Sequence, residues 1–329
     1  MTKVLVTGGT GFLGKRLAEI LNELDYDVTA SGRNTKVGTD LEEQGITFVQ
    51  NDLANEQTTV DVCKDKEYVF HCGALSASWG RYEDFYQSNV VGTENVIKGC
   101  RIHGVKRLIH TSSPSIYAMN QDRFNVKETA ELPKVKVNAY AETKYEAEKL
   151  IDAAFENGLP VISIRPRAIF GPNDSNILPR LLQANNEKKL PFIRGGKAMM
   201  DVTYVDNVVA ALLKCIDSPE STLGKKYNIT NGEPMTFHTL VKQLFTELDE
   251  RMYSKNIPYP IAYSLAGLLE MTAKIRKSDK EPILTRTTVQ MLGRSVTLDI
   301  SKAEKELHYK PEISVADGVK AYVESIKSI

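Results

Sequence analysis

The sequence has no excess of charge of either sign, because 42 lysine and arginine residues balance 42 aspartate and glutamate residues. Such a balance gives nucleic acids and anionic membranes no broad electrostatic attraction. We therefore expect no nucleic-acid partner. The sequence also has no internal repeat and no low-complexity tract.

Cysteine is scarce, and the four cysteines show neither a CxxC pair nor the spacing of a metal site. They are Cys63, Cys72, Cys100 and Cys215. Scattered cysteines of this kind predict reduced, mostly buried thiols and no metal centre. The first predicted strand begins within three residues of the start, which leaves no room for a signal peptide, so we expect a cytoplasmic protein.

Long hydrophobic runs are also missing, although residues 257–269 carry no charge and residues 274, 276 and 277 are basic. The run is too short to span a bilayer and contains two prolines. Three interpretations of residues 257–275 are open: core of a lobe, an apolar cover over a substrate, or an interfacial anchor for peripheral membrane contact. Core is the favoured interpretation, because most apolar runs are core.

The most informative stretch is residues 4–14, VLVTGGTGFLG. A short apolar run predicts a buried strand, and the apolar residues of 15–21 recur at helical spacing. Glycines between such a strand and helix permit a tight turn, close approach of a pyrophosphate, and close helix packing. The unit predicts dinucleotide binding by Gly8, Thr10, Gly11, Phe12, Leu13 and Gly14.

Further strands are predicted at 27–31, 46–50, 66–74, 105–113 and 160–167, alternating with helical segments. This alternation predicts an α/β fold, a doubly wound parallel Rossmann sheet with right-handed crossovers. After about residue 175 the alternation loosens. We expect a nucleotide-binding domain over 1–174 and mainly a smaller C-terminal substrate-binding lobe over 175–329, with some later segments returning to the first domain.

The second predicted strand ends in Ser31, Gly32 and Arg33, where folds that select NAD usually place an acidic residue for the ribose 2′-hydroxyl. The guanidinium of Arg33 could instead pair with a 2′-phosphate. The sequence therefore favours NADP and leaves NAD open.

Other cofactor candidates lie at the carboxyl ends of predicted strands, where ligands bind in open α/β sheets. Asp52 could accept from an adenine amino group or cap a helix. His71 lies inside an apolar run and is interpreted as a core histidine. The remaining candidates are Leu53, Cys72, Gly73, Ala74, Ser112, Pro166, Ala168 and Ile169.

Tyr140 and Lys144 lie four apart in the helical segment 138–149 and so share one face. With the other motifs they resemble the extended short-chain dehydrogenase/reductase family. The matching stretches are 7–14, 51–53, 89–96, 111–113, 140–144, 165–166 and 171–172. Residues 165–174, 201–209, 227–234 and 299–307 are most similar to the 3β-hydroxysteroid dehydrogenase and sterol-4α-carboxylate 3-dehydrogenase branch, whose bacterial relatives reduce long-chain 2-alkyl-3-keto acids.

The resemblance implies hydride transfer between nicotinamide C4 and a secondary alcohol or ketone, with Tyr140 as general acid/base. Lys144 would stabilise the phenolate and bind the nicotinamide ribose. Ser113, or else Ser112, would donate to the substrate oxygen, and Asn89 would order the site. The family also implies a homodimer and, in this branch, a small hydrophobic substrate.

A second implied function is that of a sugar-nucleotide epimerase or dehydratase with tightly bound NAD. Such enzymes often have an arginine where this chain has residues 199–201, Met-Met-Asp. A diphosphate would lack its cationic partner there unless Arg167, Arg180 or Arg194 replaced it. A non-catalytic NADP sensor is the least favoured alternative, because such proteins often lose the tyrosine or the lysine.

Overall fold

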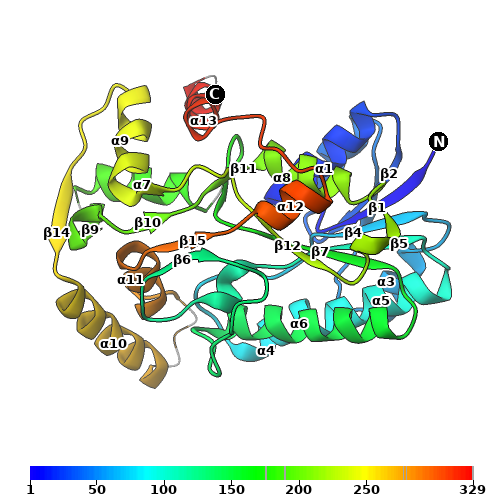
Figure 1. The fold of residues 1–329 in the computed structure, drawn as a ribbon, viewed down its shortest axis with the longest axis horizontal. Coiled ribbons are helices and arrows are strands. Elements are labelled where there is room, and N and C mark those ends of the chain that lie inside the picture. Colours follow the sequence, from blue (N-terminus) through cyan, green and yellow to red (C-terminus); the bar gives the residue numbers. More distant parts are fainter. Residues whose placement is uncertain (175, 189, 277, 279, 328–329) are drawn as a thin grey trace.

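The computed structural model describes residues 1–329 except 175, 189, 277, 279 and 328–329 (Figure 1). Its first half alternates strands and helices in the order β1 (Lys3–Thr7), α1 (Phe12–Glu23), β2 (Asp27–Gly32), α2 (Thr35–Glu42), β3 (Thr47–Gln50), α3 (Glu56–Val62), β4 (Tyr68–His71), α4 (Tyr82–Phe85), α5 (Gly92–Ile102), β5 (Arg107–Thr111), β6 (Arg123–Val126), α6 (Ala139–Glu156) and β7 (Val161–Pro166).

The second half has shorter strands. In order it comprises β8 (Ile169–Phe170), α7 (Leu178–Asn186), β9 (Leu190–Ile193), β10 (Met199–Met200), β11 (Thr203–Tyr204), α8 (Val205–Lys214), β12 (Lys226–Ile229), β13 (Met235–Thr236), α9 (Phe237–Glu247), β14 (Ser254–Ile257), α10 (Tyr259–Ile275), α11 (Arg286–Gly293), β15 (Val296–Leu298), α12 (Ser301–Glu306) and α13 (Val315–Lys327).

The main sheet of the described residues has seven strands in the order β12-β7-β5-β4-β1-β2-β3. Every pair in it is parallel. The order reverses beside β1, which places the first glycine turn at a topological switch point, the usual ligand crevice of such sheets. The predicted Rossmann sheet is confirmed, and each strand expected before residue 168 is present. Neither β6 nor β12 was predicted from the sequence.

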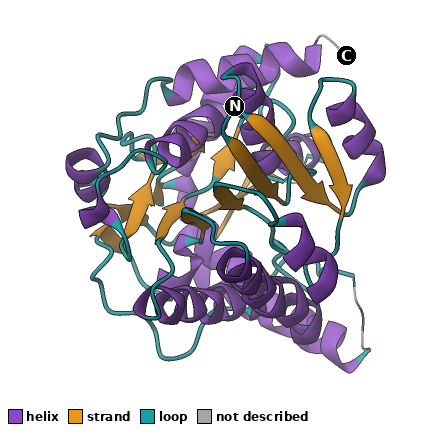
Figure 2. Cartoon of the chain, turned by 90° about the vertical axis from the view of Figure 1, so that its right-hand side faces the viewer, coloured by secondary structure: helices purple, strands orange, loops and turns teal. Residues whose placement is uncertain are grey.

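Helices cover both faces of this sheet, as Figure 2 shows. On one face α1 and α8 pack against side chains such as Val4, Val6 and Ile164. On the other face α3, α5 and α6 pack against Leu5, Val69 and Leu108. Apolar residues on successive strand positions therefore point to alternate faces, and both faces are buried, as a parallel sheet requires.

The remaining strands form smaller sheets in the second half of the chain. A four-stranded sheet has the order β13-β10-β15-β6, and two-stranded sheets join β11 to β8 and β14 to β9. A second apolar core lies among α7, α9 and α13. Segments of both halves interleave, because β12 completes the main sheet and β6 joins the four-stranded one.

The favoured interpretation of residues 257–275 as core is wrong. α10 buries only Ala262, Ala266 and Glu270 and exposes most of its large apolar side chains. Within the described part of the chain no helix is long and apolar enough to cross a membrane.

Candidate functional site

The turn after β1 packs so tightly against neighbouring backbone that a side chain at either of two of its glycines would collide with it. Gly8 has a φ of 69°, and a Cβ there would lie 2.5 Å from the Cα of Gly73, at the end of β4. A Cβ on Gly14 would lie 2.2 Å from the carbonyl oxygen of Gly8. The turn therefore brings two strand ends and the start of α1 together and leaves exposed backbone for a phosphate group at the helix N-terminus.

The residues predicted for this turn lie in one short stretch of chain. Gly11 precedes the first residue of α1, and its N–H donates to the Gly8 carbonyl at 2.9 Å. Phe12, Leu13 and Gly14 form the first turn of the helix. Thr10 packs against Gly32, where a Cβ would meet its Oγ1 at 2.3 Å. Among the described residues no side chain caps α1, so the first N–H groups of the helix remain available to a ligand.

The end of β2 lies beside this turn. The Gly9 N–H donates to the Ser31 carbonyl at 2.9 Å, and the buried Ser31 hydroxyl has no partner among the described residues. Arg33 follows and is exposed. At the end of β3, Asp52 is exposed and accepts from the Ala54 N–H at 3.1 Å. The residue that caps α3 is Asn55, so the capping role considered for Asp52 is wrong.

β4 delivers small residues to the same edge. His71 is buried, and its two ring nitrogens pair with Thr7 Oγ1 at 2.8 Å and Thr93 Oγ1 at 2.9 Å. These contacts confirm the predicted core histidine, and burial lowers the pKa of His71 to about 3. Cys72, Gly73 and Ala74 follow it. Burial raises the pKa of the Cys72 thiol to about 11, so the thiol is no nucleophile at neutral pH.

Asn89 lies in a π-helical turn, Tyr86–Val91, directly before α5. Its Oδ1 accepts from the Leu75 N–H at 2.6 Å, and its Nδ2 donates to Thr143 Oγ1 at 3.0 Å. The buried amide thereby ties the loop after β4 to α6 beside Lys144. π-Turns are frequent at functional sites. Here the turn places the Asn89 side-chain amide between the loop after β4 and α6.

The ammonium of Lys144 is buried and is held from the sheet side. It donates to the Thr111 carbonyl at 2.8 Å and lies 3.4 Å from His110 Nε2. Burial lowers the pKa of Lys144 to about 8, against the opposing attraction of Glu148. Burial and Lys144 also depress the pKa of His110, which stays neutral and accepts through Nε2. Lys144 therefore remains charged at neutral pH.

The two serines after β5 differ in their hydrogen bonds. The Ser112 hydroxyl donates to Oε1 of Glu148. Ser113 caps the 3₁₀ helix Pro114–Tyr117, and its Oγ accepts from the Ser115 N–H at 3.2 Å. A hydroxyl has one proton to donate, and Ser112 already donates its proton to Glu148. The geometry thus favours Ser113 as the donor to a ligand.

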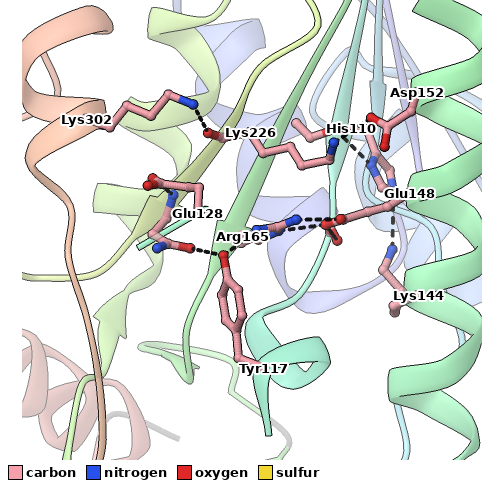
Figure 3. Close-up of polar contacts among 12 residues, drawn as sticks. His110, Tyr117, Glu128, Lys144, Glu148, Asp152, Arg165, Lys226 and Lys302 are labelled. Atoms are coloured by element: carbon pink, nitrogen blue, oxygen red, sulfur yellow. Dashed lines mark hydrogen bonds and ion pairs between the residues drawn. The ribbon is translucent and has the colours of Figure 1, made fainter. Parts of the chain in front are cut away.

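Below these serines lies a buried charged network that was not predicted from the sequence (Figure 3). Arg165 on β7 forms two parallel bonds to Glu148 on α6, at 2.7 Å and 2.6 Å. Arg165 also donates to the Tyr117 hydroxyl, and burial raises the pKa of Tyr117 to about 12. Glu148 follows Lys144 by four residues on the same helix, and this spacing is the signal that could have suggested its place.

Tyr140 is the second residue of α6, one turn before Lys144, and is half-buried. Asn138 caps this helix by accepting from the Ala141 N–H at 2.9 Å, which fixes where the first turn begins. The predicted residues Pro166, Ala168 and Ile169 lie at the carboxyl end of β7 and the start of β8. The structure therefore brings Ser113, Lys144 and Pro166 to the same edge of the sheet, and Tyr140 lies on α6 one turn before Lys144.

Arg167 also lies at this edge and has an incomplete set of partners. Its enclosed Nε finds no hydrogen-bond partner among the described residues. Burial lowers the pKa of Arg167, and the buried carboxylate of Asp201 opposes this shift. The Asp201 carboxylate accepts from the Leu298 N–H at 2.6 Å. Among the described residues, no cluster of histidine, cysteine and acidic side chains could hold a metal ion.

The chain belongs to the NAD dependent epimerase/dehydratase family, whose model matches residues 4–230. It is thus an NAD(P)-dependent protein of the extended short-chain dehydrogenase/reductase type. The glycine turn fits such a nucleotide, because its close backbone contacts leave no side chain in the way.

Among curated proteins the chain is 32% identical to 2-alkyl-3-oxoalkanoate reductase of Stenotrophomonas maltophilia, over 97% of each chain. It is also 32% identical to the sterol-4-alpha-carboxylate 3-dehydrogenase, decarboxylating, of Mus musculus, over 98% of this chain and 90% of that one. Among solved structures, the UDP-glucuronic acid 4-epimerase of Bacillus cereus in complex with NAD is 21% identical and superposes with a TM-score of 0.80, with 99% of both chains covered. The last likeness concerns the fold.

Proposed function

We propose that the protein is a reductase or dehydrogenase that interconverts a ketone and a secondary alcohol on a hydrophobic substrate, steroid-like or a long-chain 3-oxo or 3-hydroxy compound. The proposal is supported by the buried Lys144 ammonium, which donates to the Thr111 carbonyl at the end of β5, two residues before Ser113, and by Tyr140, one turn before Lys144 on α6. Relatives that match nearly the whole chain are named for such reactions.

A bound nicotinamide nucleotide supplies or accepts the hydride. Tyr140 donates the proton to the substrate oxygen in reduction and removes it in oxidation. An ordinary phenol has a pKa near 10, and the charge of Lys144 stabilises the phenolate that forms. Ser113 donates a hydrogen bond to the same oxygen as negative charge develops.

The other side chains position this set. Thr111 and His110 hold the Lys144 ammonium from the sheet side. Asn89 fixes α6 against the loop after β4. Glu148 accepts the hydrogen bond of the Ser112 hydroxyl. The neutral state of His110 keeps a second positive charge away from Lys144.

The runner-up is a sugar-nucleotide epimerase or dehydratase. The residues before β11 are Met199, Met200 and Asp201, so no cation stands there for a diphosphate. Arg180 pairs with Glu281 at 3.2 Å, and Arg194 pairs with Asp122 at 3.0 Å. These ion pairs engage two of the three arginines that could have replaced the missing cation. This supports an apolar ketone, rather than a sugar nucleotide, as the substrate.

The test is oxidation of NADPH and of NADH, followed at 340 nm, with 3-ketosteroids, 2-alkyl-3-oxo acids and aryl ketones, and with sugar nucleotides assayed by chromatography. We expect turnover of an apolar ketone, with NADPH preferred. Arg33→Ser should weaken NADPH binding about tenfold and leave NADH binding unchanged, because it removes one charged hydrogen bond to a 2′-phosphate. Conversion of a sugar nucleotide alone, without net cofactor oxidation, contradicts the proposal.

We further expect Arg167 to receive the carboxylate of a 2-alkyl-3-oxo acid, because its guanidinium lies at the carboxyl edge with an unpaired Nε. Arg167→Leu should raise KM for the acid at least about tenfold, the loss of one charged hydrogen bond. KM for the methyl ester of the same acid should barely change. Arg194→Leu is the matched control, since its guanidinium already pairs with Asp122. Equal effects on acid and ester would refute this assignment.

A further inference from the structure

α10 presents a stripe of large apolar side chains to solvent. Eight of the fifteen exposed large hydrophobic side chains among the described residues lie between Tyr253 and Met291. Those on α10 are Ile261 (61% exposed), Leu265 (49%), Leu268 (56%), Met271 (52%) and Ile275 (75%). At about 100° per residue these positions fall on one face of the helix about 120° wide. An apolar stripe along one face of a surface helix is typical of interfacial helices.

The opposite face of α10 is fully engaged with the protein. Ala262 and Ala266 pack with Ile193 and Val289, and the Glu270 carboxylate accepts from the backbone N–H and Nε of Arg286 at 2.7 Å and 2.8 Å. α10 is therefore fixed against α11, at the periphery of the molecule in Figure 1. Its exposed stripe cannot turn inward without breaking these contacts.

The exposed charges at the C-terminal end of α10 and just beyond it are mainly basic, and the acidic Glu281 that follows them pairs with Arg180 at 3.2 Å. Lys274, Arg276 and Lys280 are exposed at the end of α10, and within the described part of the chain no ion pair engages them. The acidic residue of α10, Glu270, is buried and paired with Arg286. Since the whole chain carries no net charge, this cationic end is a local feature.

The stripe is too small to hold a second copy of the chain on its own. A helix of 17 residues is roughly 25 Å long, and one face of it offers on the order of 250 Å². Stable protein interfaces bury about 800 Å² on each partner. A lipid surface has no such minimum, because apolar side chains and cations each add to binding independently.

We propose that α10 docks on the surface of an anionic phospholipid bilayer. The helix lies in the plane of the interface, with Ile261, Leu265 and Leu268 among the acyl chains. Lys274, Arg276 and Lys280 pair with lipid phosphates. Apolar side chains and positive charges therefore lie on the same part of the surface, as they do in interfacial helices.

Docking at this place brings the membrane next to the substrate side of the fold. The segment after α10 contacts the loop after β4, where Trp79 Nε1 donates to the Ser278 carbonyl at 3.2 Å. The same segment contacts α7 through the Arg180–Glu281 pair. An apolar substrate dissolved in the bilayer would therefore meet the protein on the side of its catalytic edge.

The test is cosedimentation of the full chain with vesicles of phosphatidylcholine alone or with 30% phosphatidylglycerol, about the anionic fraction that attracts basic segments. We expect binding to the anionic vesicles and its loss in high salt. Leu265→Ser with Leu268→Ser should lower partitioning about tenfold, and Lys274→Gln with Arg276→Gln should lower it several-fold.

Ile102→Ser is the matched control, because Ile102 is 59% exposed on α5 and away from α10. It should bind vesicles as the parent does. No sedimentation with anionic vesicles, or equal sedimentation of all variants, overturns the proposal. So does a dimer in solution that the leucine substitutions dissociate, since a second copy would then cover the stripe. The measurement needs no enzymatic turnover, so its outcome is separate from that of the proposed reaction.

Discussion

Replacing Tyr140 with phenylalanine is expected to lower kcat for ketone reduction by about a thousandfold, the usual contribution of a positioned proton donor. The substitution removes one hydroxyl and keeps the ring. Tyr140 begins α6 one turn before Lys144, whose ammonium is buried against the Thr111 carbonyl. Binding of the nicotinamide nucleotide, measured by fluorescence titration, should stay within about twofold, because the glycine turn and Lys144 are untouched.

Tyr145→Phe is the matched control on the same helix. The Tyr145 ring lies beside Lys136, with the ammonium 4.1 Å from its centroid, and packs near Ile116 and Tyr117. Its loss of a hydroxyl should leave kcat unchanged. Near-normal turnover of Tyr140→Phe would remove Tyr140 from the reaction.

The pH profile of kcat/KM tests Lys144 separately. Because burial lowers the pKa of Lys144 to about 8, its charge is present below that pH and is lost above it. The rate of ketone reduction should therefore fall as pH rises through about 8. Glu148 raises the pKa of Lys144, so Glu148→Gln should move this fall to lower pH. An unchanged profile in Glu148→Gln would contradict the electrostatic link between the two residues.

The second large effect is expected on stability. Arg165→Met should lower the free energy of unfolding by about 3–5 kcal/mol, because it leaves the Glu148 carboxylate buried without its partner. Both side chains are only 3% exposed and are joined by two hydrogen bonds. Thermal unfolding followed by circular dichroism should show a fall in Tm of about 5–15 °C.

Two variants distinguish a stranded charge from general damage to the core. Arg165→Met combined with Glu148→Leu removes both charges and should recover a large part of the loss. Lys98→Met breaks the surface pair with Glu56, whose side chains are 50% and 60% exposed, and should cost at most about 1 kcal/mol. If the double variant loses as much free energy of unfolding as Arg165→Met and Glu148→Leu lose together, the two side chains are not energetically coupled.

The sequence predicted those parts of the molecule that depend on local pattern. The glycine turn from Gly8 to Gly14, the six strands predicted before residue 168 and the core position of His71 all follow from short apolar runs and the glycine and polar residues that end them. The parallel sheet follows from their alternation with helices. The family comparison is consistent with this fold, since its model spans residues 4–230.

Features that depend on distant contacts were not predicted. The Arg165–Glu148 pair joins β7 to α6, and only their packing reveals that both side chains are buried. The π-turn around Asn89 depends on where Leu75 and Thr143 lie. α10 was misjudged because the composition of residues 257–275 does not show which neighbours are present to cover the helix. Here α11 covers one face, and the stripe from Ile261 to Ile275 stays exposed.

The late arrival of β12 has a consequence for how the chain acquires its structure during synthesis. β12 pairs with β7, and Tyr227 and Ile229 share an apolar core with Val4 and Val6 of the first strand. Ile300 and Tyr309 belong to the same core. One face of the sheet therefore stays incomplete until nearly the whole chain has left the ribosome, and loop closure over such separations is slow. The nascent first half should expose apolar surface meanwhile and depend on chaperones to avoid aggregation.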